Sequence, residues 1–139
     1  LTIRPLLPDE RSEWEPLWRG YLAFYHSSQP PEVTDLIWAR IHDPAQPMFA
    51  LGAYVDGKLV GITHYLFHHT FWTAGDYCYL QDLFVDQTVR GTGIGEALIA
   101  AVEREARKCG ASRVHWLTRE ENTVARGLYD KVAERSGFI

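Results

Sequence analysis

Residues 86–98 read DQTVRGTGIGEAL, with glycines at the alternate positions 91, 93 and 95. The segment before them, residues 77–85, is rich in β-forming residues, and the spacing of apolar residues after them predicts a helix over 93–108, closed by Gly110. Glycines allow backbone N–H groups to converge on an anion, and the start of a helix adds the positive end of its dipole. The pattern favours a phosphate or pyrophosphate site, with Arg90 able to pair with a further phosphate. A tight strand-to-helix turn without a ligand is the alternative.

Two common phosphate-binding motifs do not fit this stretch. A P-loop needs Gly-Lys-Ser/Thr where the helix begins, and this helix begins Gly95-Glu96-Ala97. A dinucleotide fingerprint needs a third glycine where Glu96 stands, and it would follow the first strand of the domain rather than about the fourth.

The segments on either side predict a mixed sheet with helices on its faces. Asp9 is placed to cap a first helix that carries an aromatic stripe, and Asp56–Gly57 predicts a two-residue hairpin turn. The order is β-α-α-β-β-β-α-β-α, an α/β (α+β) fold in a single domain over residues 1–139. The expected strands are 1–5, 48–55, 59–67, 77–85 and 112–118, and the expected helices begin near residues 9, 30, 93 and 120.

Composition excludes several other classes of protein. The 139 residues are 46% apolar and 13% aromatic, which excludes a disordered chain, and no sequence period indicates a repeat protein. A net charge of −4 argues against nucleic acid as the main partner. Cys78 and Cys109 are too few for a disulfide framework, and no apolar run is long enough for a membrane span, so we expect a cytoplasmic protein.

Three linked motifs resemble the GNAT N-acetyltransferase superfamily. Arg90-x-x-Gly93-x-Gly95 resembles its coenzyme A pyrophosphate loop, residues 79–86 (YLQDLFVD) its fourth strand, and Asn122-x-x-Ala125-x-x-x-Tyr129 its last conserved helix. The sequence LQDLFV at residues 80–85 and the aromatic first helix are most similar to the polyamine- and histone-acetylating branch. The resemblance implies a GNAT acyl-CoA N-acyltransferase fold and transfer of acetyl from acetyl-CoA to a primary amine of a polyamine-like molecule, another small amine or a protein lysine. A non-catalytic acyl-CoA-binding or regulatory module on the same fold is the alternative.

The resemblance also implies the residues of the site. Tyr129 would assist departure of the thiolate, and Asn122 and Ala125 would lie beside it on one helix face against the cofactor. The backbone of Leu83, Phe84 and Val85 would pair with pantetheine and polarise the acetyl carbonyl. The diphosphate would be bound by the turn: Arg90, Gly91, Thr92, Gly93, Ile94 and Gly95.

The group that binds and deprotonates the amine is less clearly marked. Gln81 stands where members of the polyamine branch often carry Glu, and an amide accepts no proton at neutral pH. Asp82 is the nearest carboxylate, but strand alternation points it to the face opposite Gln81 unless a bulge redirects it. We expect Asp82 to act as substrate anchor or base, with Tyr79, a water chain, or an acid of the first helices (Glu13, Glu32, Asp35) as other candidates.

Further expectations concern the acceptor, metals and assembly. Tyr25 and Trp38 are expected to line the acceptor groove beside Gln81 and Asp82, because aromatic faces attract ammonium groups. No metal is expected, since His64 and His68 would lie too far apart along one strand to bind the same ion. The family normally continues into a final strand that this sequence lacks, and an exposed sheet edge there predicts a homodimer.

Overall fold

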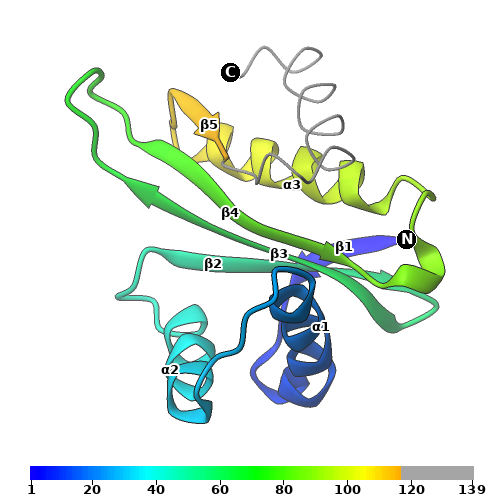
Figure 1. Cartoon of the computed structure of the whole chain (residues 1–139). Coiled ribbons are helices and arrows are strands. Elements are labelled where there is room, and N and C mark those ends of the chain that lie inside the picture. Colours follow the sequence, from blue (N-terminus) through cyan, green and yellow to red (C-terminus); the bar gives the residue numbers. More distant parts are fainter. Residues whose placement is uncertain (117–139) are drawn as a thin grey trace.

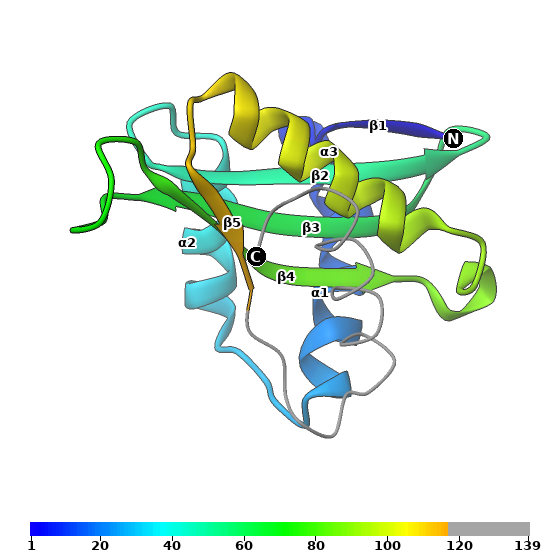
Figure 2. The same cartoon turned by 90° about the horizontal axis from the view of Figure 1, so that it is seen from above.

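The computed structural model describes residues 1–116 and shows a three-layer α/β arrangement (Figure 1). Five strands form one sheet in the order β1-β2-β3-β4-β5, antiparallel except for the parallel pair β4–β5. Helix α3 covers one face of the sheet, and α1 and α2 cover the other (Figures 1 and 2). The elements are β1 (Thr2–Pro5), the 3-10 helix η1 (Pro8–Glu10), α1 (Arg11–Phe24), α2 (Pro31–Ile41), β2 (Met48–Val55), β3 (Lys58–His68), β4 (Tyr77–Val85), the 3-10 helix η2 (Gln87–Val89), α3 (Ile94–Lys108) and β5 (Arg113–His115).

The predicted fold class and element order are confirmed through β5; the helix expected from residue 120 lies outside the described residues. The β2–β3 turn has Asp56 and Gly57 at φ 50° and 77°, the left-handed conformation that a tight hairpin turn requires. No helix of the described part is long and apolar enough to cross a membrane.

The two faces of the sheet bury different side chains. Aliphatic residues of α3, among them Leu98, Ile99 and Val102, pack against β4 and β5 through Leu80 and Val114. The opposite face is aromatic: α1 and α2 contribute a cluster over β2 and β3 whose largest members are Trp14, Trp18 and Trp38. Trp14 is fully buried, so the aromatic stripe of the first helix is mostly core.

The start of α1 differs from the prediction that Asp9 caps it. The N-cap residue of α1 is Glu10, which makes no side-chain cap to that helix. The Glu10 carboxylate instead accepts hydrogen bonds from the Leu7 N–H, the Arg4 guanidinium and the Tyr54 hydroxyl. Asp9 lies inside the preceding 3-10 helix η1, one residue before the N-cap of α1, so it is not placed to cap α1.

Candidate active site

A β-bulge in β4 places the central carboxylate of the site. His64 of β3 pairs with Asp82 and Tyr65 pairs with Leu80, so Gln81 is an extra residue without a partner on β3. Leu80 therefore faces the α3 side, whereas Asp82 faces the α1 side and is buried there. The bulge considered in the sequence analysis is present, and it directs Asp82 toward the helices α1 and α2 while Gln81 is exposed.

Asp82 is held by a buried chain of hydrogen bonds. Its Oδ2 lies 2.9 Å from Nδ1 of His64, and Nε2 of His64 lies 3.1 Å from the indole Nε1 of Trp14. The backbone carbonyl of Asp82 accepts a further hydrogen bond from the Thr63 hydroxyl at 2.8 Å. Within residues 1–116 no hydrogen bond reaches the second carboxylate oxygen, Oδ1, which leaves that atom as the acceptor available to a ligand.

A second group of polar side chains continues along the same face toward β5. The Tyr79 ring stacks on His115 of the neighbouring strand β5, with centroids 4.8 Å apart and 2° between the planes. Burial raises the pKa of Tyr79, and the nearby charge of Asp82 raises it further. Nε2 of His115 lies 2.9 Å from Nε2 of His68, and burial, followed by the charges of His68 and Arg113, lowers the pKa of His115. Both shifts favour the neutral forms of Tyr79 and His115.

Among the described residues, the ladder between β4 and β5 ends at this stacked pair. The two strands pair only through Tyr77, Cys78 and Tyr79 of β4, so among the described residues the segment from Leu80 to Val85 has no strand partner on that side. Leu83 and Val85 pack toward the α3 cluster, whereas Phe84 packs against Gly20 of α1, where an added Cβ would lie 3.0 Å from the ring. The segment can offer its backbone N–H and C=O groups to an extended ligand, the role expected for Leu83, Phe84 and Val85.

The glycine-rich turn joins this open strand edge to α3. Gly91 and Gly93 have φ of 83° and 85°, and the space where a Cβ would stand is open at both. Gly93 is the N-cap residue and supplies no side-chain cap, so the first N–H groups of α3 are not capped by it. Thr92 donates its hydroxyl to the Val89 carbonyl, and the Ile94 side chain is buried against the sheet, so from Ile94 only the backbone faces outward. This geometry fits the diphosphate of coenzyme A.

Arg90 takes a different position from the one expected at the mouth of the turn. Its Nε donates to the Val85 carbonyl at 3.0 Å, and its guanidinium lies over the rings of Phe84 and Phe24, at 5.1 and 5.9 Å. It therefore ties the turn to β4 and α1. Its pairing with phosphate stays a prediction.

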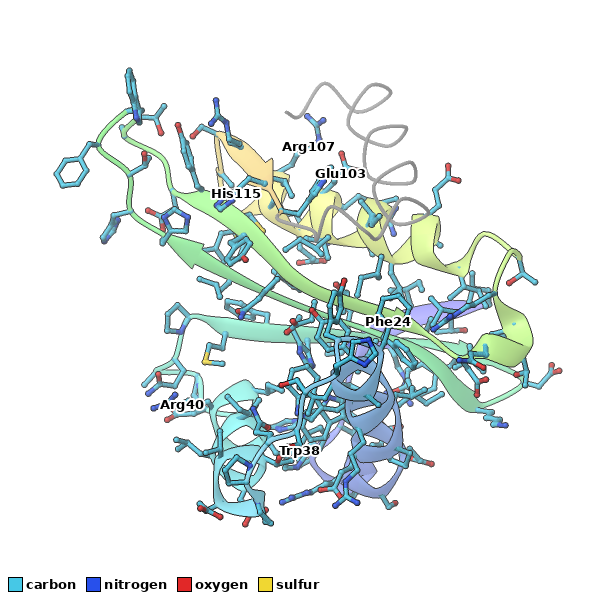
Figure 3. All side chains as sticks on the ribbon, in the orientation of Figure 1. Phe24, Trp38, Arg40, Glu103, Arg107 and His115 are labelled. Atoms are coloured by element: carbon cyan, nitrogen blue, oxygen red, sulfur yellow. The ribbon has the colours of Figure 1, made fainter. Side chains whose placement is uncertain are left out.

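The remaining predicted residues are separate from Asp82 or outside the described part. Trp38 lies between α2 and α1 (Figure 3) and is 9% exposed, with its ring 4.8 Å from that of Trp14. That burial leaves it little surface for a ligand. Tyr25, at the end of α1, is half-buried and contacts the rings of Tyr21 and Phe24. Asn122, Ala125 and Tyr129 lie outside the described residues, and among residues 1–116 no three candidate ligands lie close enough to hold a metal ion.

The roles of Trp14 and His64 were not predicted. The available signal was the succession of two β-rich segments, 59–67 and 77–85, which as antiparallel neighbours allow a histidine of one strand to face an acid of the next. The register that pairs them depends on the bulge at Gln81, which no residue type in the sequence marks.

The mixed five-stranded sheet, with α3 on one face and α1 and α2 on the other, is the arrangement expected of a GNAT acyltransferase fold. A family model described as the Acetyltransferase (GNAT) family matches residues 11–133, and the chain belongs to that family. It is an N-acetyltransferase. A relative is the D-amino-acid N-acetyltransferase HPA3 of Saccharomyces cerevisiae, 33% identical over the whole of this chain and 88% of the relative.

Two further proteins are similar over large parts of the chain. The L-ornithine N5-acetyltransferase NATA1 of Arabidopsis thaliana is 25% identical over 77% of this chain, which spans 49% of that protein. The solved aminoglycoside N-acetyltransferase AAC(6')-Iy, in complex with CoA, superposes with a TM-score of 0.84 at 21% identity over 99% of this chain and 87% of that one. The structural likeness supports the fold.

Proposed function

We propose that the protein transfers the acetyl group of acetyl-CoA to the primary amine of a small molecule, which Asp82 binds as an alkylammonium ion. One observation carries the proposal: within residues 1–116, the buried Asp82 carboxylate has one oxygen without a hydrogen bond, and it lies on the part of β4 that has no strand partner on the β5 side. A carboxylate in such a site attracts a cation strongly, because little water screens the charge.

The class of acceptor follows from the same carboxylate. A polyamine, an amino acid and a diamine such as ornithine all present an ammonium group, and the names of two relatives specify amino-acid acceptors. The likeness of residues 80–85 to the polyamine- and histone-acetylating branch fits that chemistry but specifies no acceptor. We propose a small amine over a protein lysine. The non-catalytic alternative rested on Gln81, and Asp82 supplies the carboxylate that Gln81 lacks.

The reaction needs the ammonium to lose a proton before it can attack. Only about one in a thousand primary alkyl amines is neutral at pH 7. Asp82, directly or through water, takes that proton; the amine nitrogen then bonds to the acetyl carbon while the carbon–sulfur bond breaks and the thiolate is protonated to CoA–SH. The N–H groups of residues 83–85 would polarise the acetyl carbonyl, and Tyr129 would stabilise the departing thiolate by a hydrogen bond.

The diphosphate of acetyl-CoA would be bound by the turn of Arg90, Gly91, Thr92, Gly93, Ile94 and Gly95, with Asn122 and Ala125 beside the pantetheine arm. Gly91 and Gly93 support this part of the proposal, because both adopt a left-handed conformation with no side chain between the turn and a ligand. Tyr25 and Gln81 remain proposed contributors to acceptor binding, Gln81 by its exposed amide at the bulge, whereas the burial of Trp38 favours a role in the core.

We also propose that the protein is a homodimer. The β3–β4 hairpin extends beyond the sheet (Figure 1) and carries Phe71 and Trp72 fully or largely exposed, an apolar surface that a second subunit would cover. Light scattering at micromolar concentration is expected to give twice the mass of one chain; the mass of a single chain would contradict the dimer.

The test of the proposed reaction uses purified protein, acetyl-CoA and matched acceptors. Thiol release is followed with spermidine, ornithine, D- and L-amino acids and a lysine peptide, each beside an analogue in which hydroxyl replaces the amine. We expect release that depends on a small amine and fails with every hydroxyl analogue. Release that is equal with and without an amine, or absent with all of them, would overturn the proposal, and release with the peptide alone would move the acceptor to protein lysine.

A further inference from the structure

We propose that Trp14 and His64 are positioning residues for Asp82: the indole N–H fixes the imidazole in its Nδ1-protonated form, and that N–H holds Asp82 Oδ2 so that Oδ1 faces the acceptor. This inference rests on the proposed function for its catalytic meaning. Its structural content, a particular tautomer of a particular histidine, is tested without any activity.

Hydrogen-bond accounting determines where the proton lies on His64. The indole N–H of Trp14 is a donor and never an acceptor, so Nε2 of His64, 3.1 Å away, must offer its lone pair. The single proton of a neutral imidazole then lies on Nδ1, where it is donated to Asp82 Oδ2 at 2.9 Å. A proton on Nε2 would place two N–H groups against each other.

The net charge of the hydrogen-bonded pair of His64 and Asp82 affects how strongly Asp82 attracts an ammonium acceptor. With His64 neutral, the pair formed by His64 and Asp82 carries the full negative charge of the carboxylate. A doubly protonated imidazole would neutralise that charge and weaken the attraction for a cation. A proton on Nε2 is incompatible with the hydrogen bond that this nitrogen accepts from the Trp14 indole at 3.1 Å.

The surroundings hold the chain rigidly. Trp14 is completely buried, and His64 and Asp82 are each 9% exposed. The Trp14 ring lies between those of Trp18 and Trp38, at 6.1 and 4.8 Å. On the α1 side, His64 lies 6.0 Å from the ring of Trp14 and 5.0 Å from that of Trp18, and Tyr79 is the titratable side chain whose pKa the charge of Asp82 raises.

The first experiment reads the tautomer by nitrogen-15 NMR of labelled histidine at neutral pH. The chain has six histidines, and the resonances missing from His64→Asn assign His64. We expect the Nδ1-protonated form in the wild type and its loss in Trp14→Phe, which keeps the ring and removes the donor.

Trp18→Phe is the matched control for that substitution. Trp18 lies on the same helix, its ring is 5.0 Å from His64, and its indole N–H donates to Gln29. It should leave the Nδ1-protonated form intact. An Nε2-protonated His64 in the wild type, or the same tautomer in the wild type and Trp14→Phe, would overturn the inference.

The second experiment asks whether the hydrogen bond to Asp82 serves the reaction. Asparagine keeps an N–H donor at the δ position that His64 uses, whereas leucine has none, and both leave the Trp14 N–H without its partner. We expect His64→Leu to lower kcat/KM for the acceptor about tenfold to a hundredfold, with KM for acetyl-CoA unchanged, and His64→Asn to restore most of the loss.

The outcomes separate the two proposals. Equal kcat/KM in the wild type and His64→Leu would overturn the positioning role and leave the acetyltransferase function standing. A wild type that acetylates no amine but shows the Nδ1-protonated His64 would overturn the proposed function alone.

Discussion

Asp82 owes its position to Gln81, the neighbour that occupies β4 without a partner on β3. Without the extra residue, Asp82 would share the face of Leu80 and enter the aliphatic layer under α3, where an unpaired carboxylate is costly to bury. With it, Asp82 meets the Nδ1–H of His64 on the aromatic side. The extra residue Gln81 thus moves Asp82 from the aliphatic core under α3 to the candidate site on the α1 side.

The Asp82→Asn substitution tests that position at constant shape. The amide neither accepts the proton of the acceptor nor carries the charge that attracts it, so we expect kcat/KM to fall about a hundredfold or more, measured by thiol release. Asp76→Asn is the control, because Asp76 is also a β4-proximal acid paired with a histidine, His69, but lies in the exposed hairpin. Unchanged kcat/KM and an unchanged pH profile in Asp82→Asn would contradict the assignment.

Among the elements, η2 and the glycine-rich turn connect the end of β4 to the start of α3 as one continuous unit. Asp86 closes its first turn by accepting from the N–H and hydroxyl of Thr88, and these hydrogen bonds lower the pKa of Asp86. Gly91 and Gly93 then turn the chain into α3 with left-handed conformations. The unit places the open backbone of Gly91 and Gly93 after the part of β4 that, among residues 1–116, has no strand partner on the β5 side.

Comparing Gly93→Ala with Gly57→Ala separates the cost of backbone strain in the folded protein from the loss of CoA binding. A left-handed alanine costs about 1 kcal/mol of unfolding free energy, whether at Gly93 or in the hairpin at Gly57, since both have open space for the added methyl. Urea denaturation should show similar losses for Gly93→Ala and Gly57→Ala. Calorimetry should show the Kd for CoA weakened about tenfold in Gly93→Ala alone. Equal CoA affinity in the two variants would remove the turn from the binding site.

At the scale of the whole molecule, Glu10 ties the N-terminal elements to the sheet. Its carboxylate accepts from Arg4 of β1 through two bonds of 2.9 and 3.0 Å, and from Tyr54 of β2 at 2.9 Å. The bonds to Arg4 are the main cause that lowers the pKa of Glu10 from 4.5 to about 2. Because the folded state favours the charged form, this stabilisation is present above pH 4.5 and is lost as the pH falls toward 2.

Glu10→Gln should therefore change both stability and its pH dependence. We expect a loss of about 2 kcal/mol of unfolding free energy at pH 7, since a charged hydrogen-bonded pair is broken, and a smaller difference from wild type at pH 3. Urea denaturation at the two pH values measures this. Glu32→Gln, exposed on α2, is the control and should change little at either pH. A Glu10→Gln deficit that is the same at both pH values would contradict the account.

Much of the fold was predictable from local pattern. Each of these features depends on residues that lie close together in the sequence: the apolar spacing of α3, the Asp56–Gly57 turn and the β-rich segments. Their order along the chain predicts the sheet. The bulge at Gln81 was not predictable, because it depends on the register of β3 against β4. Nor was the position of Glu10, whose partners lie on two strands. The sequence motifs indicated which segments form the candidate site, but they did not predict the hydrogen bonds among its side chains.

The proposed transfer is tested by following the acetyl group itself. Acetyl-CoA labelled with carbon-13 at the acetyl carbonyl is mixed with the purified protein and the best small-amine acceptor, and NMR records the carbonyl resonance over time. We expect the thioester signal to be replaced by that of an amide on the acceptor nitrogen, with one equivalent of free CoA thiol. A thioester signal that persists with bound protein, or that converts only to free acetate, would contradict the proposed transfer.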